Sequence, residues 1–309
     1  MSVLQNDRIA VRVCQMYYLE DYSQKEIAQL LHISRPQISR IIATARSRNI
    51  VSITVNDPFA LERSLEKQLA EHFSLPEALV FDSRSPEGLG RSAAQHIELY
   101  LSDANRVGVM SGRAIYSMAK ALTTINRRGL EFVPLVGGIG SGNAVWHASS
   151  IAQSMAQKSG GTSYVMNAPL TVQSSAIRDA LAQEPGISSV LRLGRECDVS
   201  LVGIGSINED STTMLAGAMT AQDIRELHRA GAVCAICNSY LDRDGNLLDV
   251  PMIHRTVGQT LETVRSSRMI ALAAGKNKVE AIKSALKSGF VDVLITDMDT
   301  AQNILENSH

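Results

Sequence analysis

Three segments of small residues have the composition of loops that bind anions, and each follows a β-rich run. They are Ser111-Gly112-Arg113, segment 137–143 (GGIGSGN) and segment 203–206 (GIGS). Where such a loop leads into a helix, its backbone N–H groups and the helix dipole attract negative charge. One glycine loop is more often only a tight turn, but three at one sheet edge favour a pocket. We expect an anionic ligand to contact Ser111, Gly112, Arg113, Gly138, Gly140, Ser141, Gly142 and Asn143.

Two lysines strengthen the expectation of an anion site. Lys276 and Lys278 fall at the predicted start of a helix, after a β-rich run at 269–274. The helix dipole disfavours cations at this end, so cations placed there indicate a negative ligand nearby. The alternative is that both side chains simply extend into water.

A second group of residues has the chemistry of nucleic-acid binding. Residues 34–48 hold four arginines and no acidic residue. Ser23 and Glu26 have the spacing of a capping box, which starts a helix over 23–31. Helices are also predicted over 7–19 and 34–47, the last with a buried stripe of isoleucines.

Two helices joined by a tight turn form a helix-turn-helix, whose second helix enters the major groove of DNA. We expect Gln37 and Arg40 to contact bases, and Ser39 is small enough to let the helix lie close to the DNA. Phosphate contacts are expected from Ser34, Arg35, Arg46 and Arg48. The alternative is a solvated helix on a small packing or dimerisation module.

Composition predicts two domains and excludes several protein classes. The 309 residues are 45% hydrophobic and 20% charged, which is ordinary for a globular protein. No apolar run reaches the ~18 residues of a membrane span, the first residues do not resemble a secretory signal, and four cysteines are too few for a disulfide framework. We therefore expect a cytoplasmic protein. Residues 1–55 carry seven basic and four acidic side chains, although the whole chain has a net charge of −1.

The boundary between the domains is predicted at Asn56-Asp57-Pro58, which separates a helix-turn-helix domain (1–55) from a larger domain (56–309). A short strand is expected over 50–55, before the boundary. After it, leucines recur every four residues on a connecting helix, which could pack on the larger domain or form a seam between chains. β-rich runs then begin near residues 78, 106, 131, 163, 199, 232, 269 and 291, and helical stretches alternate with them. This pattern indicates an α/β fold with a mainly parallel sheet.

Several motifs that suggest cofactors or metals are incomplete. A dinucleotide fingerprint begun at Gly138 would need glycine at position 143, which is Asn143. Cys234 and Cys237 lie in a predicted strand, where residues three apart point to opposite faces, so they are expected in the core. Asp242 and Asp244 lack the rest of a calcium loop. No histidines have the spacing of metal ligands, so we expect no cofactor and no metal.

Segment 22–51 (YSQKEIAQLLHISRPQISRIIATARSRNIV) resembles the helix-turn-helix of the SorC/DeoR family of bacterial sugar-responsive transcription regulators. Landmarks of that family's effector-binding domain follow in order, namely RVGVMSGRAI at 106, VPLVGG at 133, NAPL at 167, DVSLVGIGS at 198, DRDGNLLD at 242 and, most specifically, residues 268–301. The resemblance implies a Rossmann-like effector domain similar to sugar-phosphate isomerase folds, and commonly a tetramer. It also implies effector contacts by Lys278 and Asp242, although Asp242 could instead cap its own turn.

These features predict a transcription factor of carbohydrate metabolism whose binding to operator DNA is controlled by a sugar or sugar phosphate. We expect a homo-oligomer, as a dimer of dimers, with two DNA-binding units per pseudo-palindromic site and no membrane association. The alternative is an enzyme like a sugar-phosphate isomerase or deaminase with an appended DNA-binding unit. We find no convincing general base for it, although a Schiff base through Lys278 would serve either a catalyst or a sensor.

Overall fold

The computed structural model describes residues 7–53, 55–83, 85–138, 144–208 and 218–306. The chain divides into two compact units, residues 1–58 and residues 59–309. The division falls at Pro58, the last residue of the predicted boundary segment.

The smaller unit is a bundle of three helices. They are α1 (Asp7–Tyr18), α2 (Gln24–Leu31) and α3 (Arg35–Ser47), close to the predicted ranges. Ser23 begins α2 with a complete capping box, in which its backbone N–H donates to the Glu26 carboxylate at 2.8 Å. Val13, Ile27 and Ile38 are fully buried at the centre of the bundle. The apolar stripe of each helix therefore holds the three helices together.

The predicted strand over 50–55 is wrong. Residues 50–53 and 55 adopt neither helix nor strand, and the side chains of Ile53 and Val55 are 56% and 81% exposed. β-branched residues stabilise a strand only where a neighbouring strand provides backbone and side-chain partners. The described residues offer this segment none.

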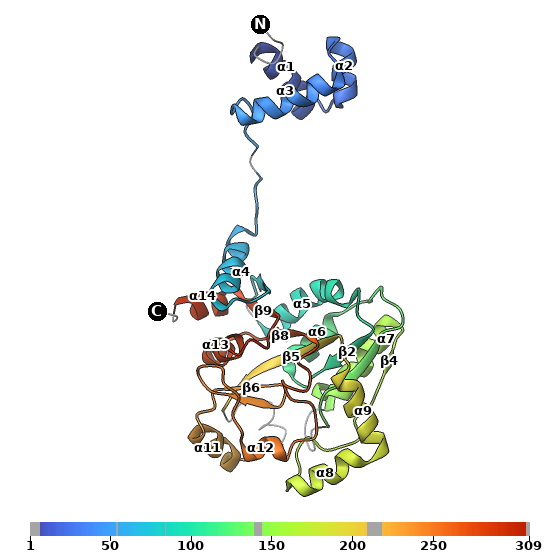
Figure 1. Ribbon diagram of the computed structural model, residues 1–309, viewed down its shortest axis with the longest axis vertical. Helices are drawn as coiled ribbons and strands as arrows, with labels where there is room; N and C mark the ends of the chain where they lie inside the picture. Colours follow the sequence, from blue (N-terminus) through green and yellow to red (C-terminus); the bar gives the residue numbers. More distant parts are fainter. Residues whose placement is uncertain (1–6, 54, 84, 139–143, 209–217, 307–309) are drawn as a thin grey trace. The chain divides into compact units, whose positions relative to one another are not determined.

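The larger unit is built on a parallel sheet in the order β1-β9-β8-β5-β2-β3-β4 (Figure 1). Its strands are β1 (Glu77–Phe81), β2 (Arg106–Val109), β3 (Glu131–Pro134), β4 (Thr162–Ser163), β5 (Val199–Ser206), β8 (Arg268–Leu272) and β9 (Val293–Asp297). Each begins within a few residues of a β-rich run in the sequence.

An antiparallel hairpin extends the end of β5. It consists of β6 (Cys234–Ile236) and β7 (Ser239–Leu241), with Ile204 opposite Ile236. Segment 203–206 therefore continues strand β5, whereas the sequence predicted a turn between strand and helix there. Strand β7 was missed because three residues are too few to show a period.

Helices cover both faces of the sheet. One face packs against α5 (Pro86–Leu101), α6 (Arg113–Ala121) and α7 (Ala148–Ser159). The other packs against α4 (Ala60–Phe73), α9 (Pro185–Arg195), α13 (Val279–Lys287) and α14 (Met298–Glu306). Side chains along a strand alternate between these layers, as Ile270 and Ala271 of β8 do. A sheet buried on both faces explains why its strands read as nearly continuous apolar runs.

The direction of strand addition reverses between β2 and β5. The chain passes from β2 to β3 on one side of this pair, and from β5 through the hairpin to β8 on the other side. The other α-helices of the described residues are α8 (Ser175–Gln183), α11 (Ala221–Arg229) and α12 (Pro251–His254). In an open parallel sheet, the crevice at the carboxyl ends of such a pair is the usual ligand site.

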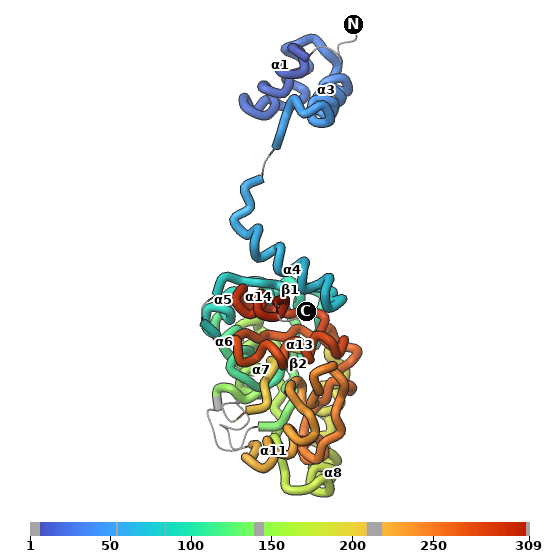
Figure 2. Tube along the Cα trace, turned by 90° about the vertical axis from the view of Figure 1, so that its left-hand side faces the viewer, coloured from blue at the N-terminus to red at the C-terminus, as the bar shows by residue number. Residues whose placement is uncertain are grey.

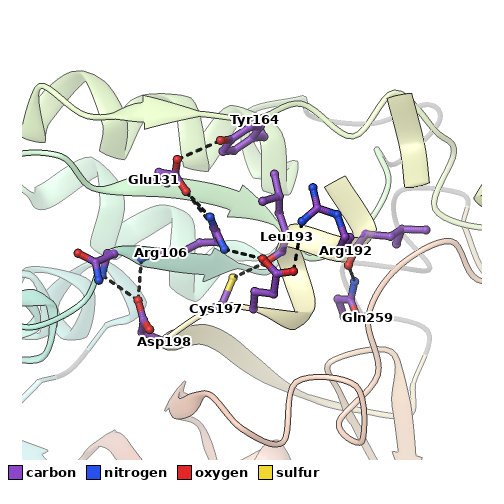
Figure 3. Close-up of polar contacts among 11 residues, drawn as sticks. Arg106, Glu131, Tyr164, Arg192, Leu193, Cys197, Asp198 and Gln259 are labelled. Carbon is purple, nitrogen blue, oxygen red and sulfur yellow. Dashed lines mark hydrogen bonds and ion pairs between the residues drawn. The ribbon is translucent and has the colours of Figure 1, made fainter. Parts of the chain in front are cut away.

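The opposite end of these strands is fixed by a polar network (Figure 3). Arg106, at the start of β2, forms ion pairs with Glu131 of β3 at 2.7 Å and with Glu196 at 3.0 Å. The Asp198 carboxylate accepts hydrogen bonds from the backbone N–H groups of Asn105 and Arg106. The amino ends of β2, β3 and β5 are thereby held in register, which also orients their carboxyl ends.

Helix α4 packs on β1 and α14 of the larger unit (Figure 2). Leu65 and Leu69 are buried there, and the Glu66 carboxylate accepts a hydrogen bond from Val80 N–H on the outer edge of β1. Leu61, by contrast, is 51% exposed. Leu65 and Leu69 therefore pack on the larger unit, which is one of the two roles considered for the leucine stripe.

We predict that Leu69→Ala lowers the free energy of unfolding of the larger unit by about 2–5 kcal/mol, because it leaves a cavity in a packed core. Leu61→Ala in the same helix should cost under about 1 kcal/mol. Urea denaturation of the full chain measures both. Equal losses that depend on protein concentration would instead identify the stripe as a seam between chains.

Candidate functional site

The smaller unit presents one polar face of α3. Helix α2 ends at His32, whose left-handed backbone (φ 54°) turns the chain sharply toward Ser34, the N-cap of α3. Ile38, Ile41, Ile42 and Ala45 are buried against α1 and α2. The opposite face is exposed and holds Pro36, Gln37, Ser39, Arg40, Ala43 and Ser47. This geometry leaves the amino-terminal half of α3 free to enter a groove.

The four predicted arginines divide into two pairs. Arg46 donates to the Tyr18 hydroxyl at 2.8 Å, and Arg48 pairs with Asp7 at 2.7 Å. Both tie the end of α3 to α1. Arg35 and Arg40 are exposed and make no polar side-chain contact among the described residues. The pair at the start of α3 is therefore the freer one for a ligand.

Gln37 also takes part in the start of α3. Its side-chain oxygen accepts hydrogen bonds from the Ser34 backbone N–H at 3.3 Å and from the Ser34 hydroxyl at 2.9 Å. The amide of this predicted base-contacting residue thus already has a role in capping the helix.

The larger unit has a pocket of about 180 Å³ at the carboxyl ends of β2 and β5. Polar lining comes from the loop after β2, the end of β5, the β6–β7 hairpin and the turn before α13, and includes Ser111, Arg113, Ser206, Asn208, Asn238, Asn277 and Lys278. Ile207, Met219, Tyr240 and Met252 form an apolar wall, which belongs to a small separate core around α11 and α12. The pocket therefore combines charged and apolar surfaces.

The loop after β2 delivers a cation and a helix N-terminus together. Gly112 is the N-cap of α6 with φ 138°, a conformation that residues other than glycine rarely adopt. Its N–H donates to the Trp146 carbonyl at 3.1 Å, so this amide is not available to a ligand. The first-turn residues Arg113 and Ala114 line the pocket, where helical N–H groups lack partners within the helix. The Arg113 guanidinium lies over the Trp146 ring, 5.9 Å from its centroid.

Lys278 supplies the second cation of the pocket. It is the N-cap of α13, after a turn that begins at Gly275 (φ 121°). The lysine is half-buried, whereas Lys276 is exposed and does not line the pocket. Burial lowers the pKa of Lys278, and the positive charge of Arg113 lowers it further. The positive charges of Arg113 and Lys278, from separate loops, thus repel each other within one small pocket. This repulsion is unfavourable until a negative group binds.

Comparison with known proteins gives one family for both units. Residues 57–306 match the family model "Putative sugar-binding domain", and residues 12–48 match "Sigma-70, region 4". The chain belongs to the SorC/DeoR family of sugar-binding transcriptional regulators.

Relatives in this family match nearly the whole chain. The deoxyribonucleoside regulator of Bacillus subtilis is 27% identical over 98% of this chain and 99% of its own length. The sorbitol operon regulator of Klebsiella pneumoniae is 29% identical over 97% of this chain and 98% of its own. The crystal structure of full-length SorC from Klebsiella pneumoniae covers 97% of this chain and 99% of that chain, with a TM-score of 0.75 and 27% identity. This SorC/DeoR chain is thus a sugar-responsive transcriptional regulator with a mixed α/β fold.

The pocket of this SorC/DeoR chain unites some of the predicted ligand residues but not all. Ser111, Gly112, Arg113 and Lys278 line it. Gly138 does not, and its N–H donates to the Ala168 carbonyl at 2.7 Å, so the predicted role of this amide in holding an anion is not supported. The predicted contacts Gly140, Ser141, Gly142 and Asn143 lie outside the described residues.

Asp242 does not line the pocket. Its carboxylate accepts hydrogen bonds from the Asn246 side chain and from the backbone N–H groups of Asp244 and Asn246, and these bonds lower its pKa. The turn is also fastened to α13, because the Ser284 hydroxyl donates to the Asp242 carbonyl at 2.6 Å. Asp242 therefore caps its own turn, which is the alternative considered from the sequence.

Sequence reasoning missed several lining residues. Asn238 and Tyr240 belong to the β6–β7 hairpin, and Thr171 and Thr256 come from distant segments that meet in an isolated bridge. Of these residues, only Asn277 could have been found from the sequence, because it lies between Lys276 and Lys278. The described residues contain no group of three or more metal-ligating side chains, nor a helix long and apolar enough to cross a bilayer.

We predict that inorganic phosphate binds the full chain more weakly as the pH rises. An anion raises the pKa of Lys278 above its lowered value in the free protein. Affinity is therefore fully present below that free-protein pKa, and is lost as the pH climbs from it toward the ligand-bound pKa. Calorimetric titration between pH 7.5 and 10.5 measures the effect. Lys278→Arg keeps its charge throughout this window and should bind equally at all pH values; a parallel decline in that variant would assign the titration elsewhere.

Proposed function

We propose that this regulator binds operator DNA through α3, and that a small phosphorylated sugar in the pocket between β2 and β5 controls this binding. The observation that carries the ligand proposal is the pair Arg113 and Lys278. Both cations line the same pocket, both stand at the start of a helix, and the charge of one lowers the pKa of the other.

A phosphate group fits this electrostatic arrangement. Its two negative charges at neutral pH offset the repulsion between the cations and accept charge-assisted hydrogen bonds. The free first-turn N–H groups of α6 add further donors. A neutral sugar would leave the two cations without a counter-charge, which is unfavourable because Lys278 is half-buried.

Size and lining restrict the remainder of the ligand. Drug-sized ligands occupy pockets of roughly 300–1,000 Å³, and this cavity measures about 180 Å³. Among its described lining residues, only Arg113 and Lys278 carry a charge. One monosaccharide with one phosphate matches both features. Asn208, Asn238 and Asn277 offer amides to its hydroxyl groups.

DNA binding is assigned to the exposed face of α3. We propose that Gln37 and Arg40 contact bases, that Ser39 lies against the groove, and that Ser34 and Arg35 contact phosphates. Arg46 would reach a phosphate only by sharing or breaking its hydrogen bond to Tyr18, and Arg48 only by sharing or breaking its ion pair with Asp7. We therefore expect a smaller effect from these two arginines.

Control by a sugar requires two arrangements of the DNA-binding units that differ in affinity for the ligand. We propose a homo-oligomer, as a dimer of dimers, whose assembly the ligand alters, and a location in the cytoplasm with the DNA. We also propose that the chain is not an enzyme. Among the described lining residues there is no aspartate, glutamate or histidine to act as a general base.

We predict that Arg40→Ala weakens binding to a duplex enriched from a random library by about 1–3 kcal/mol and relaxes its selectivity, whereas Arg35→Ala weakens binding to all sequences and reduces the salt slope by about one. Fluorescence anisotropy at increasing salt measures both. Arg229→Ala, in α11 of the larger unit, is the matched control and should change neither. The DNA proposal fails if log K for the wild-type chain has no negative dependence on log salt.

We predict that ribose 5-phosphate, fructose 6-phosphate or glucose 6-phosphate raises the melting temperature of the full chain, while its unphosphorylated parent sugar has little effect. Trp146 is the one tryptophan of the chain, so its fluorescence reports on ligands near Arg113. Lys278→Met should weaken the affinity for the sugar phosphate, measured from this fluorescence, about 10- to 100-fold. Lys276→Met should leave that affinity unchanged. An equal response to the free sugar contradicts the phosphate assignment, and conversion of the sugar phosphate, followed by ³¹P NMR, would favour an enzyme.

A further inference from the structure

The position of Gln37 in α3 determines whether its side chain can donate or accept hydrogen bonds at DNA. It is the third residue of the helix and exposed, and its side-chain oxygen closes the capping box with Ser34. Its role at DNA rests on the proposed entry of α3 into the major groove.

The orientation of the Gln37 amide is set by the donors that surround it. The Ser34 backbone N–H and hydroxyl both direct hydrogens at the Gln37 oxygen. Turning the amide over would bring its NH₂ group against the backbone N–H, so that donor would face donor. The oxygen has two lone pairs and two donors, and is saturated. Only the NH₂ group remains to contact a ligand.

The smaller unit contains a second version of the same box for comparison. In α2, Ser23 is paired with Glu26, whose carboxylate accepts the N-cap N–H at 2.8 Å, and these hydrogen bonds lower its pKa. A carboxylate is the stronger partner for a helix N-terminus. The helix with the free polar face has the neutral amide instead, which avoids a negative charge beside DNA phosphates and directs N–H groups outward.

We propose that Gln37 recognises its base pair solely as a hydrogen-bond donor, and therefore selects guanine, the one base with two acceptors and no donor in the major groove. Glutamine normally reads adenine by donating to N7 and accepting from N6 at once. Here the acceptor is engaged by Ser34, so adenine can accept one hydrogen bond at N7 while its N6 amino group faces a second donor and stays unpaired. Guanine N7 and O6 both accept, so the NH₂ group alone satisfies guanine.

Arg40 extends the same preference to a neighbouring pair. It lies three residues further along α3, exposed and without a polar partner among the described residues. Three residues of helix rise about 4.5 Å, close to the roughly 3.4 Å between successive base pairs. Arginine also has donors only and prefers guanine. The two side chains together specify two adjacent pairs that contain guanine.

Selection from a fully randomised duplex library tests the proposal without a known operator. The wild-type full chain should enrich guanine at the pair that Gln37 contacts, by about tenfold over adenine. Gln37→Met locates that pair, because it should remove the preference there and nowhere else. Gln37→Glu keeps the capping box but turns an acceptor outward, so the preference should change to cytosine or adenine.

Glu26→Gln in α2 is the matched control, since it alters the other capping box and should leave the selected motif unchanged. Circular dichroism of each variant confirms that α3 remains helical. Enrichment of adenine at the located pair, or an unchanged preference in the folded Gln37→Glu chain, overturns the inference. Failure of the wild-type chain to enrich any motif contradicts the proposed DNA binding itself.

Discussion

Two positive side chains that share one small pocket are the interaction on which the ligand chemistry of this molecule depends. Arg113 and Lys278 are far apart in the chain, and they converge only because β2 and β8 run parallel on either side of β5. The carboxyl ends of parallel strands meet at one edge, and each is followed by a helix N-terminus that favours negative charge. The mutual repulsion of the two cations keeps the site ready for an anion.

The rest of the larger unit supports that arrangement from the other end. The Arg106 network fixes the amino ends of β2, β3 and β5, and helices on both faces bury the sheet. The small core of Ile207, Met219, Tyr240 and Met252 closes the pocket with an apolar wall. Other apolar lining residues, such as Met110 and Ile204, belong to the core of the main sheet, so the pocket is built on both clusters.

Local signals predicted much of this structure. The Ser23–Glu26 box and the isoleucine stripe of α3 each act within a few residues, so the helices of the smaller unit were predicted closely. Cations at a helix start drew attention to Lys276 and Lys278, and the family resemblance singled out Lys278, which alone of the two lines the pocket. Contacts between distant segments left no such trace. The hydrogen bond from Gly138 to Ala168 and the docking of the Asp242 turn on α13 depend on tertiary structure, and residues 50–55 lack the neighbouring strand that their composition favours.

Coupling between the pocket and α3 is the central claim, and reciprocity tests it most directly. A ligand that changes DNA affinity must have its own affinity changed by DNA by the same factor. The decisive measurement is the Kd of a stabilising sugar phosphate, determined from Trp146 fluorescence with and without a saturating enriched duplex. A change of about 5- to 150-fold is predicted. Identical Kd values in the two conditions would contradict control of DNA binding by the pocket.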